Sequence, residues 1–360
     1  MPRLAAAGLA LLLTGLGVSP STPPPKLPGT APVPPLPAPS PLFDLRPPPA
    51  PPAERERGVA LGMFAEDVSF SYGPLLAEIV ALGATHVALV VPLYQTDGSS
   101  HDIGLDTRYS PTLEAVADAA RLARRDGLEV TIFPILRLAS PRAGEWRGTL
   151  APSDLDAWFR HYGDALGDLA GVAALTGAKR LVIGSELSTL DGDLDHWRPL
   201  IEQVRAVFPG KLVYSANWDH YQKARLFELC DEEGVSAYFN LRDAKLPADD
   251  ATLEAGWQRV RREIEAWRSG RTRPFVFTEL GYRSRAGSTA APWDELPGGT
   301  PDLDEQRRAF AAFRRVWTGA PSLDGVYIWN WYGYGGPAST GYTPRGKPAE
   351  AEVRALLESL

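Results

Sequence analysis

The stretch Leu181-Val182-Ile183-Gly184-Ser185-Glu186-Leu187-Ser188 decides the fold. It begins as a continuous apolar run, which is typical of a strand buried on both faces, and it ends abruptly in the carboxylate of Glu186. A buried carboxylate costs free energy unless it is paired or used in chemistry. Glu186 is therefore the first candidate for a functional residue.

A second stretch, Pro274-Phe275-Val276-Phe277-Thr278-Glu279-Leu280-Gly281-Tyr282, has the same arrangement. An aromatic and β-branched run again ends in a glutamate, and a glycine turn follows. Parallel sheets collect their functional sites at the carboxyl ends of the strands, where both glutamates are expected. Each glutamate alone could also cap the next helix or pair with an arginine. Two of them in one repeated context favour catalysis.

The chain from residue 56 onward alternates short apolar runs with amphipathic stretches, which predicts parallel strands joined by helices. The expected strands cover residues 59–64, 85–92, 128–136, 180–184, 211–215, 234–238, 274–278 and 325–329. The expected helices cover residues 74–82, 113–125, 153–176, 194–207, 253–267, 303–317 and 349–357, the third with Ser153 as its N-cap. This pattern predicts one α/β domain over residues 56–360, a (β/α)8 TIM barrel. A Rossmann-like sheet is the alternative, but no GxGxxG motif follows the first strand.

The sequence before residue 56 reads as a signal segment and a linker. Residues 1–18 hold one early arginine and then an uncharged run rich in Ala and Leu, the layout of a secretory signal peptide or N-terminal anchor. Residues 19–55 contain roughly half of the 34 prolines, which predicts a disordered Pro-rich linker. We therefore expect a secreted or cell-envelope protein, extracellular or periplasmic, with a weak membrane tether if the signal is not cleaved.

Composition argues against several partners and sites. A formal net charge of -7 provides no basic surface for nucleic acid. One cysteine and five scattered histidines, without an HExxH motif, indicate neither a metal site nor a disulfide. We expect no cofactor and a monomeric protein. Ten tryptophans are a high count, and flat indole rings serve both cores and sugar-binding clefts.

In a barrel, the residues that follow every strand face one mouth. Glu186 and Glu279 are roughly 90 residues apart, or three βα units of about 30 residues, so they are expected on strands four and seven, across that mouth. Two carboxylates that flank a bond are what glycoside hydrolysis requires, because one protonates the leaving oxygen and the other attacks or activates water. No GxSxG motif occurs, and Ser185 has no evident histidine partner, so acyl transfer is disfavoured.

Several short motifs carry a family resemblance. In chain order the motifs are Trp146-Arg147-Gly148 before the helix that leads to the fourth strand, IGSELS at the fourth strand, YSANWD after it, FTELGY, and YIWNWYG near the end. Together they resemble glycoside hydrolase family 113. This family belongs to clan A, the retaining (β/α)8 hydrolases that include β-mannanases. The resemblance covers residues 59–331, and the order of the motifs along eight strands makes it moderately specific.

The resemblance implies roles by position. It makes Glu186 the acid/base and Glu279 the nucleophile. Neighbouring negative charge and apolar walls are expected to raise the pKa of Glu186. In the clan, a tyrosine on strand six hydrogen-bonds the nucleophile, and Tyr238 matches that position. A tryptophan on strand eight lies beneath the sugar, and Trp329 matches that one. Much of the clan has Asn directly before the acid/base, where this chain has Ser185, so the contact to the sugar 2-hydroxyl is in question.

Further aromatic and amide side chains are expected at the mouth. Asn217 is a candidate to replace the missing amide next to the sugar. Aromatic contacts to sugar are expected from four other residues near the strand ends: Trp146, Trp218, Tyr282 and Trp331. Plain core packing is the alternative for Tyr238 and Trp329, and loop packing for Trp146 and Trp218. Arg137 is expected either to neutralise Glu279 or to form an ordinary salt bridge.

These observations predict an exported retaining β-glycoside hydrolase that cleaves β-1,4-mannan or manno-oligosaccharides with two glutamates. One alternative is a hydrolase or transglycosylase that acts on another β-linked glycan. The other is a non-catalytic carbohydrate-binding protein at the cell surface, built on a degenerate barrel. A binding protein has no use for a matched acid and nucleophile, so the two glutamates argue against it.

Overall fold

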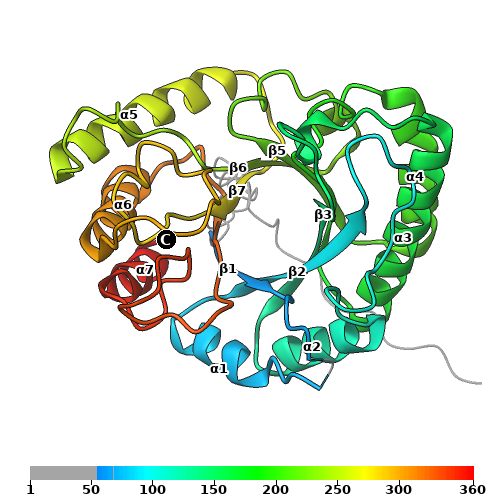
Figure 1. Cartoon of the computed structure of the whole chain (residues 1–360), viewed down its shortest axis with the longest axis horizontal. Coiled ribbons are helices and arrows are strands. Elements are labelled where there is room, and N and C mark those ends of the chain that lie inside the picture. Colours follow the sequence, from blue (N-terminus) through cyan, green and yellow to red (C-terminus); the bar gives the residue numbers. More distant parts are fainter. Residues whose placement is uncertain (1–54, 68) are drawn as a thin grey trace, which may run out of the picture. The chain divides into compact units, whose positions relative to one another are not determined.

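Eight parallel strands close into a barrel in which each strand pairs with the next one along the chain and β8 pairs back with β1 (Figure 1). The computed structural model describes residues 55–67 and 69–360. The strands are β1 (Glu56–Gly62), β2 (His86–Gln95), β3 (Glu129–Leu138), β4 (Arg180–Ser185), β5 (Lys211–Asn217), β6 (Glu232–Ser236), β7 (Phe275–Leu280) and β8 (Gly325–Ile328). The predicted (β/α)8 barrel is confirmed.

Helices surround the barrel on its outside (Figure 1). They are α1 (Gly73–Ala81), α2 (Leu113–Arg125), α3 (Leu155–Thr176), α4 (Leu194–Val207), α5 (Asp250–Trp267), α6 (Leu303–Trp317) and α7 (Pro348–Ser359), with 3-10 turns η1 (Arg147–Thr149) and η2 (Leu226–Leu229). Seven α-helices cover eight strands within the described residues, because only η2 lies between β5 and β6.

Local sequence signals set the helix ends. The Thr112 side chain accepts a hydrogen bond from the Ala115 amide (3.1 Å) at the start of α2, and this helix ends where Gly127 takes a left-handed φ of 89°. The N-cap of α3 is Asp154, which accepts from the Ala157 amide at 2.9 Å. The expected cap, Ser153, lies one residue before the N-cap position, and its hydroxyl contacts the His101 ring instead, at 3.4 Å.

The barrel has two apolar layers. Four tryptophans with no exposed surface fill the layer between strands and helices: Trp158, Trp197, Trp257 and Trp317. Burial of each large side chain stabilises the fold by about 1.5–3 kcal/mol. The interior of the barrel is a separate cluster of side chains: Ala60, Ala88, Val90, Phe133, Ile135, Val182, Val213, Tyr238, Val276, Tyr327 and Trp329. This interior layer contains Tyr238 and Trp329, two of the residues predicted to contact sugar.

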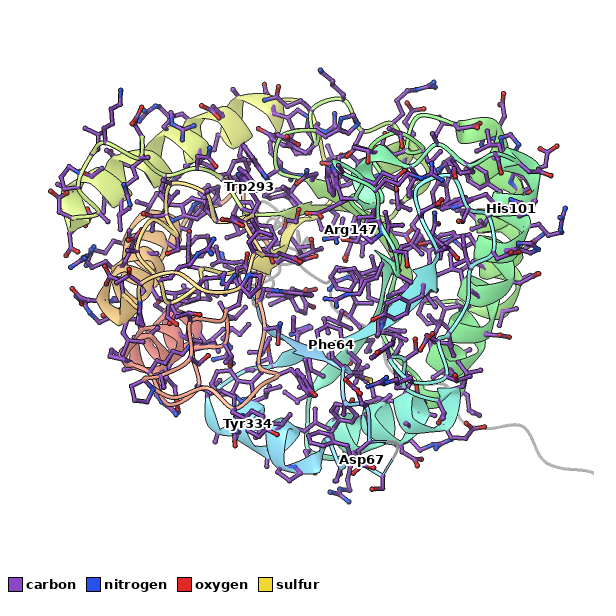
Figure 2. The ribbon with its side chains drawn as sticks, in the orientation of Figure 1. Phe64, Asp67, His101, Arg147, Trp293 and Tyr334 are labelled. Atoms are coloured by element: carbon purple, nitrogen blue, oxygen red, sulfur yellow. The ribbon has the colours of Figure 1, made fainter. Side chains whose placement is uncertain are left out.

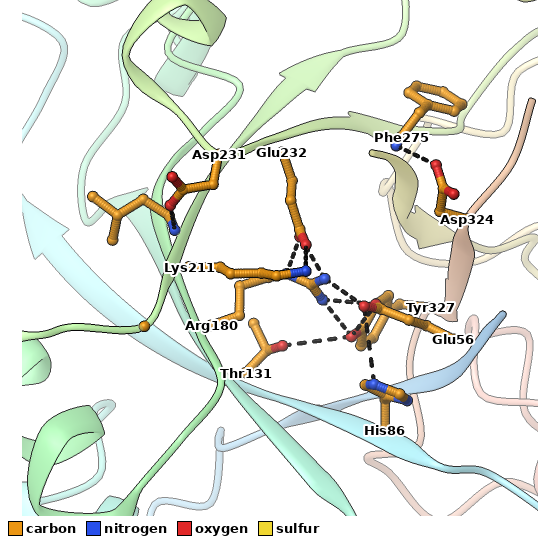
Figure 3. A network of polar contacts seen from close by, with 12 residues as sticks. Glu56, His86, Thr131, Arg180, Lys211, Asp231, Glu232, Phe275, Asp324 and Tyr327 are labelled. Atoms are coloured by element: carbon orange, nitrogen blue, oxygen red, sulfur yellow. Dashed lines mark hydrogen bonds and ion pairs between the residues drawn. The ribbon is translucent and has the colours of Figure 1, made fainter. Parts of the chain in front are cut away.

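A polar network closes the barrel at the amino ends of the strands (Figure 3). Arg180, with 4% of its side chain exposed, contacts Glu56 and Glu232, and donates to the Tyr327 hydroxyl at 2.6 Å. Lys211 reaches Glu232 at 2.5 Å. Burial alone would raise the pKa of Glu56, but Arg180 holds it below its usual value. The functional site is therefore expected at the opposite end of the barrel, where the carboxyl ends of the strands lie.

Strand boundaries differ from the prediction by a few residues. β1 ends at Gly62, two residues before the predicted end, and β6 ends at Ser236 rather than Tyr238. β2 and β3 are longer than predicted and stay paired from His86↔Glu129 to Gln95↔Leu138. β2 and β3 are the longest strands of the barrel, with 10 residues each.

The predicted signal segment, residues 1–18, and all but the last residue of the predicted linker, residues 19–55, lie outside the described residues. None of the helices within residues 55–67 and 69–360 is both long and apolar enough to cross a membrane.

Candidate active site

Glu186 and Glu279 both lie at the carboxyl end of the barrel. Glu186 directly follows β4, and Glu279 lies near the end of β7. Their exposed fractions are 4% and 1%. The Ser185 hydroxyl donates to the Glu279 carboxylate at 3.3 Å, so the residue before one glutamate contacts the other. The structure therefore brings the two carboxylates together, as the strand positions predicted.

The backbone at Glu186 has an unusual conformation. Its φ is 57°, and Glu186 is the one non-glycine residue with positive φ in the described part of the chain. Its amide donates to the Ser215 carbonyl of β5 at 2.7 Å, which holds this turn in place. A non-glycine residue in this region costs about 1–3 kcal/mol, and such strain clusters at functional sites.

The Glu186 carboxylate is held by two donors. The Arg147 guanidinium contacts one oxygen at 2.5 Å, and both side chains are largely buried. The Ser236 hydroxyl, at the end of β6, donates to the other oxygen. An arginine at this distance is a charge-assisted contact, which is stronger than a neutral hydrogen bond. Glu186 is thus fixed in direction by η1 and β6.

The Glu279 carboxylate is held by different donors. The Tyr238 hydroxyl donates to one oxygen at 2.8 Å, and Ser185 donates to the other. Tyr238 lies two residues past the end of β6, with 6% of its surface exposed. The predicted hydrogen bond between the strand-six tyrosine and this glutamate is present.

Burial and the charge of Glu186 raise the pKa of the Glu279 carboxyl to about 8. Arg147 and the hydrogen bond from Tyr238 act in the opposite direction, and Glu295 adds to the rise. Arg147 contacts Glu186 directly, so the Glu279 carboxyl, with 1% of its surface exposed, has less compensation for its burial. At neutral pH the free protein therefore keeps a proton on Glu279.

Aromatic and amide groups line the barrel beside the pair. Trp329 directly follows β8 and packs with Tyr238 in the barrel-interior cluster, with 4% of its surface exposed. Asn217 ends β5, and its side-chain oxygen accepts from the Trp218 amide at 2.9 Å. Within the described residues its amide nitrogen has no protein acceptor, so it can donate to a ligand. Trp218 is half-buried between the interior cluster and Phe239.

A family comparison agrees with this geometry. The family model described as Glycoside Hydrolase Family 113 matches residues 68–340. The chain belongs to glycoside hydrolase family 113. It is thus a glycoside hydrolase. A comparison with curated protein sequences gave no match.

Solved structures of similar shape include other family 113 proteins. A GH113 β-1,4-mannanase in a complex superposes with a TM-score of 0.76 at 22% identity, over 85% of this chain and 100% of that one. A GH113 β-mannanase from Alicyclobacillus acidocaldarius gives 0.75 at 25% identity, over 85% and 97%. A β-glucuronidase from Faecalibacterium prausnitzii gives 0.58 at 14% identity, over 85% of this chain and 49% of that one, which shows a shared barrel fold.

In this family 113 chain, Trp146 lies on the loop before η1 with 37% of its surface exposed. Its ring rests on Gly148, where an added Cβ would lie 2.3 Å from the ring. Only glycine permits this approach. The exposed ring precedes Arg147, so one short loop supplies both an aromatic face and the cation on Glu186.

Two residues predicted at the site of this glycoside hydrolase lie elsewhere. Tyr282 has no exposed surface, and its ring packs edge-on against Phe310 of α6 at 5.4 Å. Trp331 is 2% exposed, and its indole N–H donates to Glu78 of α1 at 2.8 Å. Both rings belong to the layer between strands and helices. These placements correct the expectation that Tyr282 and Trp331 contact sugar.

Arg147, Ser236 and Glu295 were not assigned to the site of this family 113 chain from sequence. Arg147 belongs to the Trp146-Arg147-Gly148 motif, but it precedes Glu186 by 39 residues and no spacing rule links a loop arginine to a strand-end acid. Ser236 could have been found, because it lies two residues before Tyr238 and alternate strand residues share a face. Glu295 is exposed on the loop between β7 and α6, and its charge acts on both Glu279 and Arg147.

Proposed function

We propose that this family 113 protein is a retaining β-glycoside hydrolase that cleaves β-1,4-mannan or manno-oligosaccharides by double displacement. The buried pair of Glu186 and Glu279, each held by its own donors, is the observation that carries the proposal. The family 113 structures of similar shape are β-mannanases, which supports mannan as the substrate.

In the first step, the Glu279 carboxylate attacks the anomeric carbon while Glu186 protonates the leaving oxygen. In the second step, Glu186 takes a proton from water, and the water oxygen releases the sugar from Glu279. Tyr238 and Ser185 donate to the Glu279 oxygens and hold the attacking atom in place. The same donors stabilise the carboxylate when it leaves the sugar.

One proton must move within the pair before the first step. In the free protein the proton is on Glu279 and Arg147 stabilises the charge of Glu186. Ionised Glu279 stabilises the positive charge that develops at the anomeric carbon in the transition state, so the reactive arrangement has the charge on Glu279 and the proton on Glu186. The loop that carries Arg147 therefore controls which carboxyl is the acid.

Asn217 is the amide we assign to the sugar hydroxyl next to the cleaved bond. Ser185 replaces the amide found at that position in much of the clan, and its hydroxyl is engaged by Glu279 at 3.3 Å. The Asn217 amide nitrogen has no acceptor among the described residues, and the side chain is 6% exposed at the end of β5. Trp329 provides the flat face beneath the sugar.

The test is a panel of β-mannan, glucomannan, cellulose and xylan incubated with the full chain, with proton NMR of the first products. Reducing sugar from mannan, released first as the β-anomer, supports the proposal, and Glu279→Gln and Glu186→Gln serve as matched inactive controls. Release from another polymer would change the substrate. Release of the α-anomer would contradict double displacement, and binding without release would indicate a non-catalytic protein.

We also propose export, on the sequence of residues 1–18 and 19–55. Cell fractionation of the full chain and of a variant that lacks residues 2–18 tests it. Mature protein outside the cytoplasm only with the segment present is the expected result, and equal distribution of both forms would contradict it.

A further inference from the structure

Arg137 is an arginine at the mouth of the barrel without a protein partner. It lies near the end of β3 and is half-buried. Its guanidinium is stacked over the Phe64 ring, 4.9 Å from the centroid. Among residues 55–67 and 69–360 it makes no hydrogen bond or ion pair, so neither role considered from sequence applies. A guanidinium stacked in this way keeps its N–H donors free at the edges.

Phe64 is fixed in position below Arg137. Its ring lies against the backbone of Gly62, where an added Cβ would be 2.2 Å from the ring. The ring also meets Tyr332 edge-on at 5.6 Å and packs against the barrel-interior cluster that holds Trp329. The arginine therefore has a defined place, continuous with the wall of the candidate active site.

Aromatic rings continue outward from Phe64 along the β1 and β8 loops. Phe70 lies 6.2 Å from Tyr332, edge-on, and is 40% exposed. Figure 2 shows Phe64 at the edge of the barrel centre, Tyr334 farther out on the same side, and Arg147 across the opening. All strongly exposed aromatic rings of the described residues lie on loops that follow strands: Phe70, Tyr109, Trp146, Trp293 and Tyr334.

We propose that Phe64, Phe70, Arg137 and Tyr332 form a subsite, here the Arg137 subsite, for a sugar unit of the same glycan beyond the cleaved bond. This inference rests on the proposed function. Aromatic faces stack on the apolar C–H faces of a pyranose, and the free guanidinium edge donates to neighbouring ring hydroxyls. The subsite makes the enzyme act on chains longer than those that fill the centre of the mouth.

The unit bound in this subsite is a neutral sugar of the substrate chain. Arg108, the nearby arginine on the β2 loop, is paired with Glu66 at 2.9 Å and is not available. The chain as a whole carries a net charge of -7, which repels acidic polymers. Continuity through Phe64 with the interior cluster makes the substrate chain itself the occupant.

The test compares Arg137→Met and Phe70→Ala in the full chain on mannohexaose and on the shortest oligosaccharide that the wild type hydrolyses. Arg137→Met keeps the length and apolar stem of the side chain. The matched control is Arg108→Met, because Arg108 also stacks on a ring, Tyr109, at 4.9 Å but already has an acidic partner.

We expect each subsite variant to raise KM for mannohexaose about tenfold, which corresponds to about 1.4 kcal/mol. KM for the short substrate, kcat and the Tm should stay at the wild-type values, and the control should match the wild type on both substrates. Equal KM values for mannohexaose in Arg137→Met and the wild type would overturn the inference, as would equal losses on both substrates. A wild type inactive on mannohexaose and on every shorter manno-oligosaccharide would instead overturn the proposed function.

Discussion

Replacement of Arg147 by Met should move the whole pH–activity profile to higher pH. The Arg147 guanidinium lies 2.5 Å from a Glu186 oxygen, with side-chain exposures of 15% and 6%. At an effective dielectric constant of about 20, two unit charges about 4 Å apart interact by about 4 kcal/mol, and a cation at this range lowers a carboxyl pKa by about 1–3 units. The variant should lose a stabilisation of this order from the ionised pair.

The sign follows from which form the cation favours. Arg147 stabilises carboxylates, so its removal makes both protons of the pair harder to lose, and both limbs of the profile shift to higher pH. In the wild type, kcat/KM should fall above about pH 8, where Glu279 of the free protein loses its proton. In Arg147→Met this alkaline limb should lie about 1–3 units higher.

The assay is kcat/KM for mannohexaose from about pH 4 to about pH 11, which covers the shifted limb. Arg147→Lys is the matched control, because it keeps a cation on the loop and should keep most of the wild-type profile. A variant Arg147→Met with reduced activity but unshifted limbs would refute the reasoning, since Arg147 would then only support the loop.

Three further predictions follow from buried charges. Arg180→Met leaves Glu232, 1% exposed, with Lys211 alone, so the free energy of unfolding in urea should fall by about 3–5 kcal/mol, and an unchanged midpoint would contradict this. Because the pKa of Glu279 is raised to about 8, the folded state binds a proton that the unfolded state releases above about pH 4.5. Wild-type stability should therefore fall as pH rises through that window. Calorimetry should show that the Tm of Glu279→Gln rises relative to the wild-type Tm between about pH 5 and about pH 8. A constant Tm difference between the two proteins over this range would contradict the prediction. Tyr238→Phe removes a donor that lowers the Glu279 pKa, so the alkaline limb of kcat/KM should move up by about one unit, whereas an unmoved limb would assign Tyr238 a packing role only.

The fold and the central pair could be predicted because they depend on local pattern. Continuous apolar runs mark strands buried on both faces, and the residue after such a run must lie at the carboxyl end of the barrel. Glu186, Glu279 and Tyr238 all follow this rule. Their pairing across the barrel needs only the count of βα units between them.

Side-chain direction past a strand end was harder to predict. Successive strand residues point to opposite faces, so Tyr282, three residues after the inward Glu279, points outward to α6. This error was avoidable. Trp331 was not predictable in the same way, because β8 ends at Ile328 and the indole then finds Glu78 on α1.

The contacts that the two arginines near the end of β3 make could not be predicted from the sequence, and the reason is physical. Arg137 lies near the end of β3 and Arg147 on the loop that follows it, yet Arg147 is buried against Glu186 and the Arg137 side chain has no hydrogen-bond or ion-pair partner among the described residues. Their difference is set by the path of the β3 loop through η1, and no residue spacing encodes that path.

The measurement that tests the central claim most directly is azide rescue of the two alanine variants of the full chain on an activated aryl β-mannoside. Azide attacks the side of the sugar that the lost carboxylate vacates. Glu279→Ala with azide should therefore yield the α-mannosyl azide, and Glu186→Ala should yield the β-mannosyl azide from a sugar already bound to Glu279. The opposite anomers would exchange the two roles, and no azide product from either variant would contradict the two-glutamate mechanism.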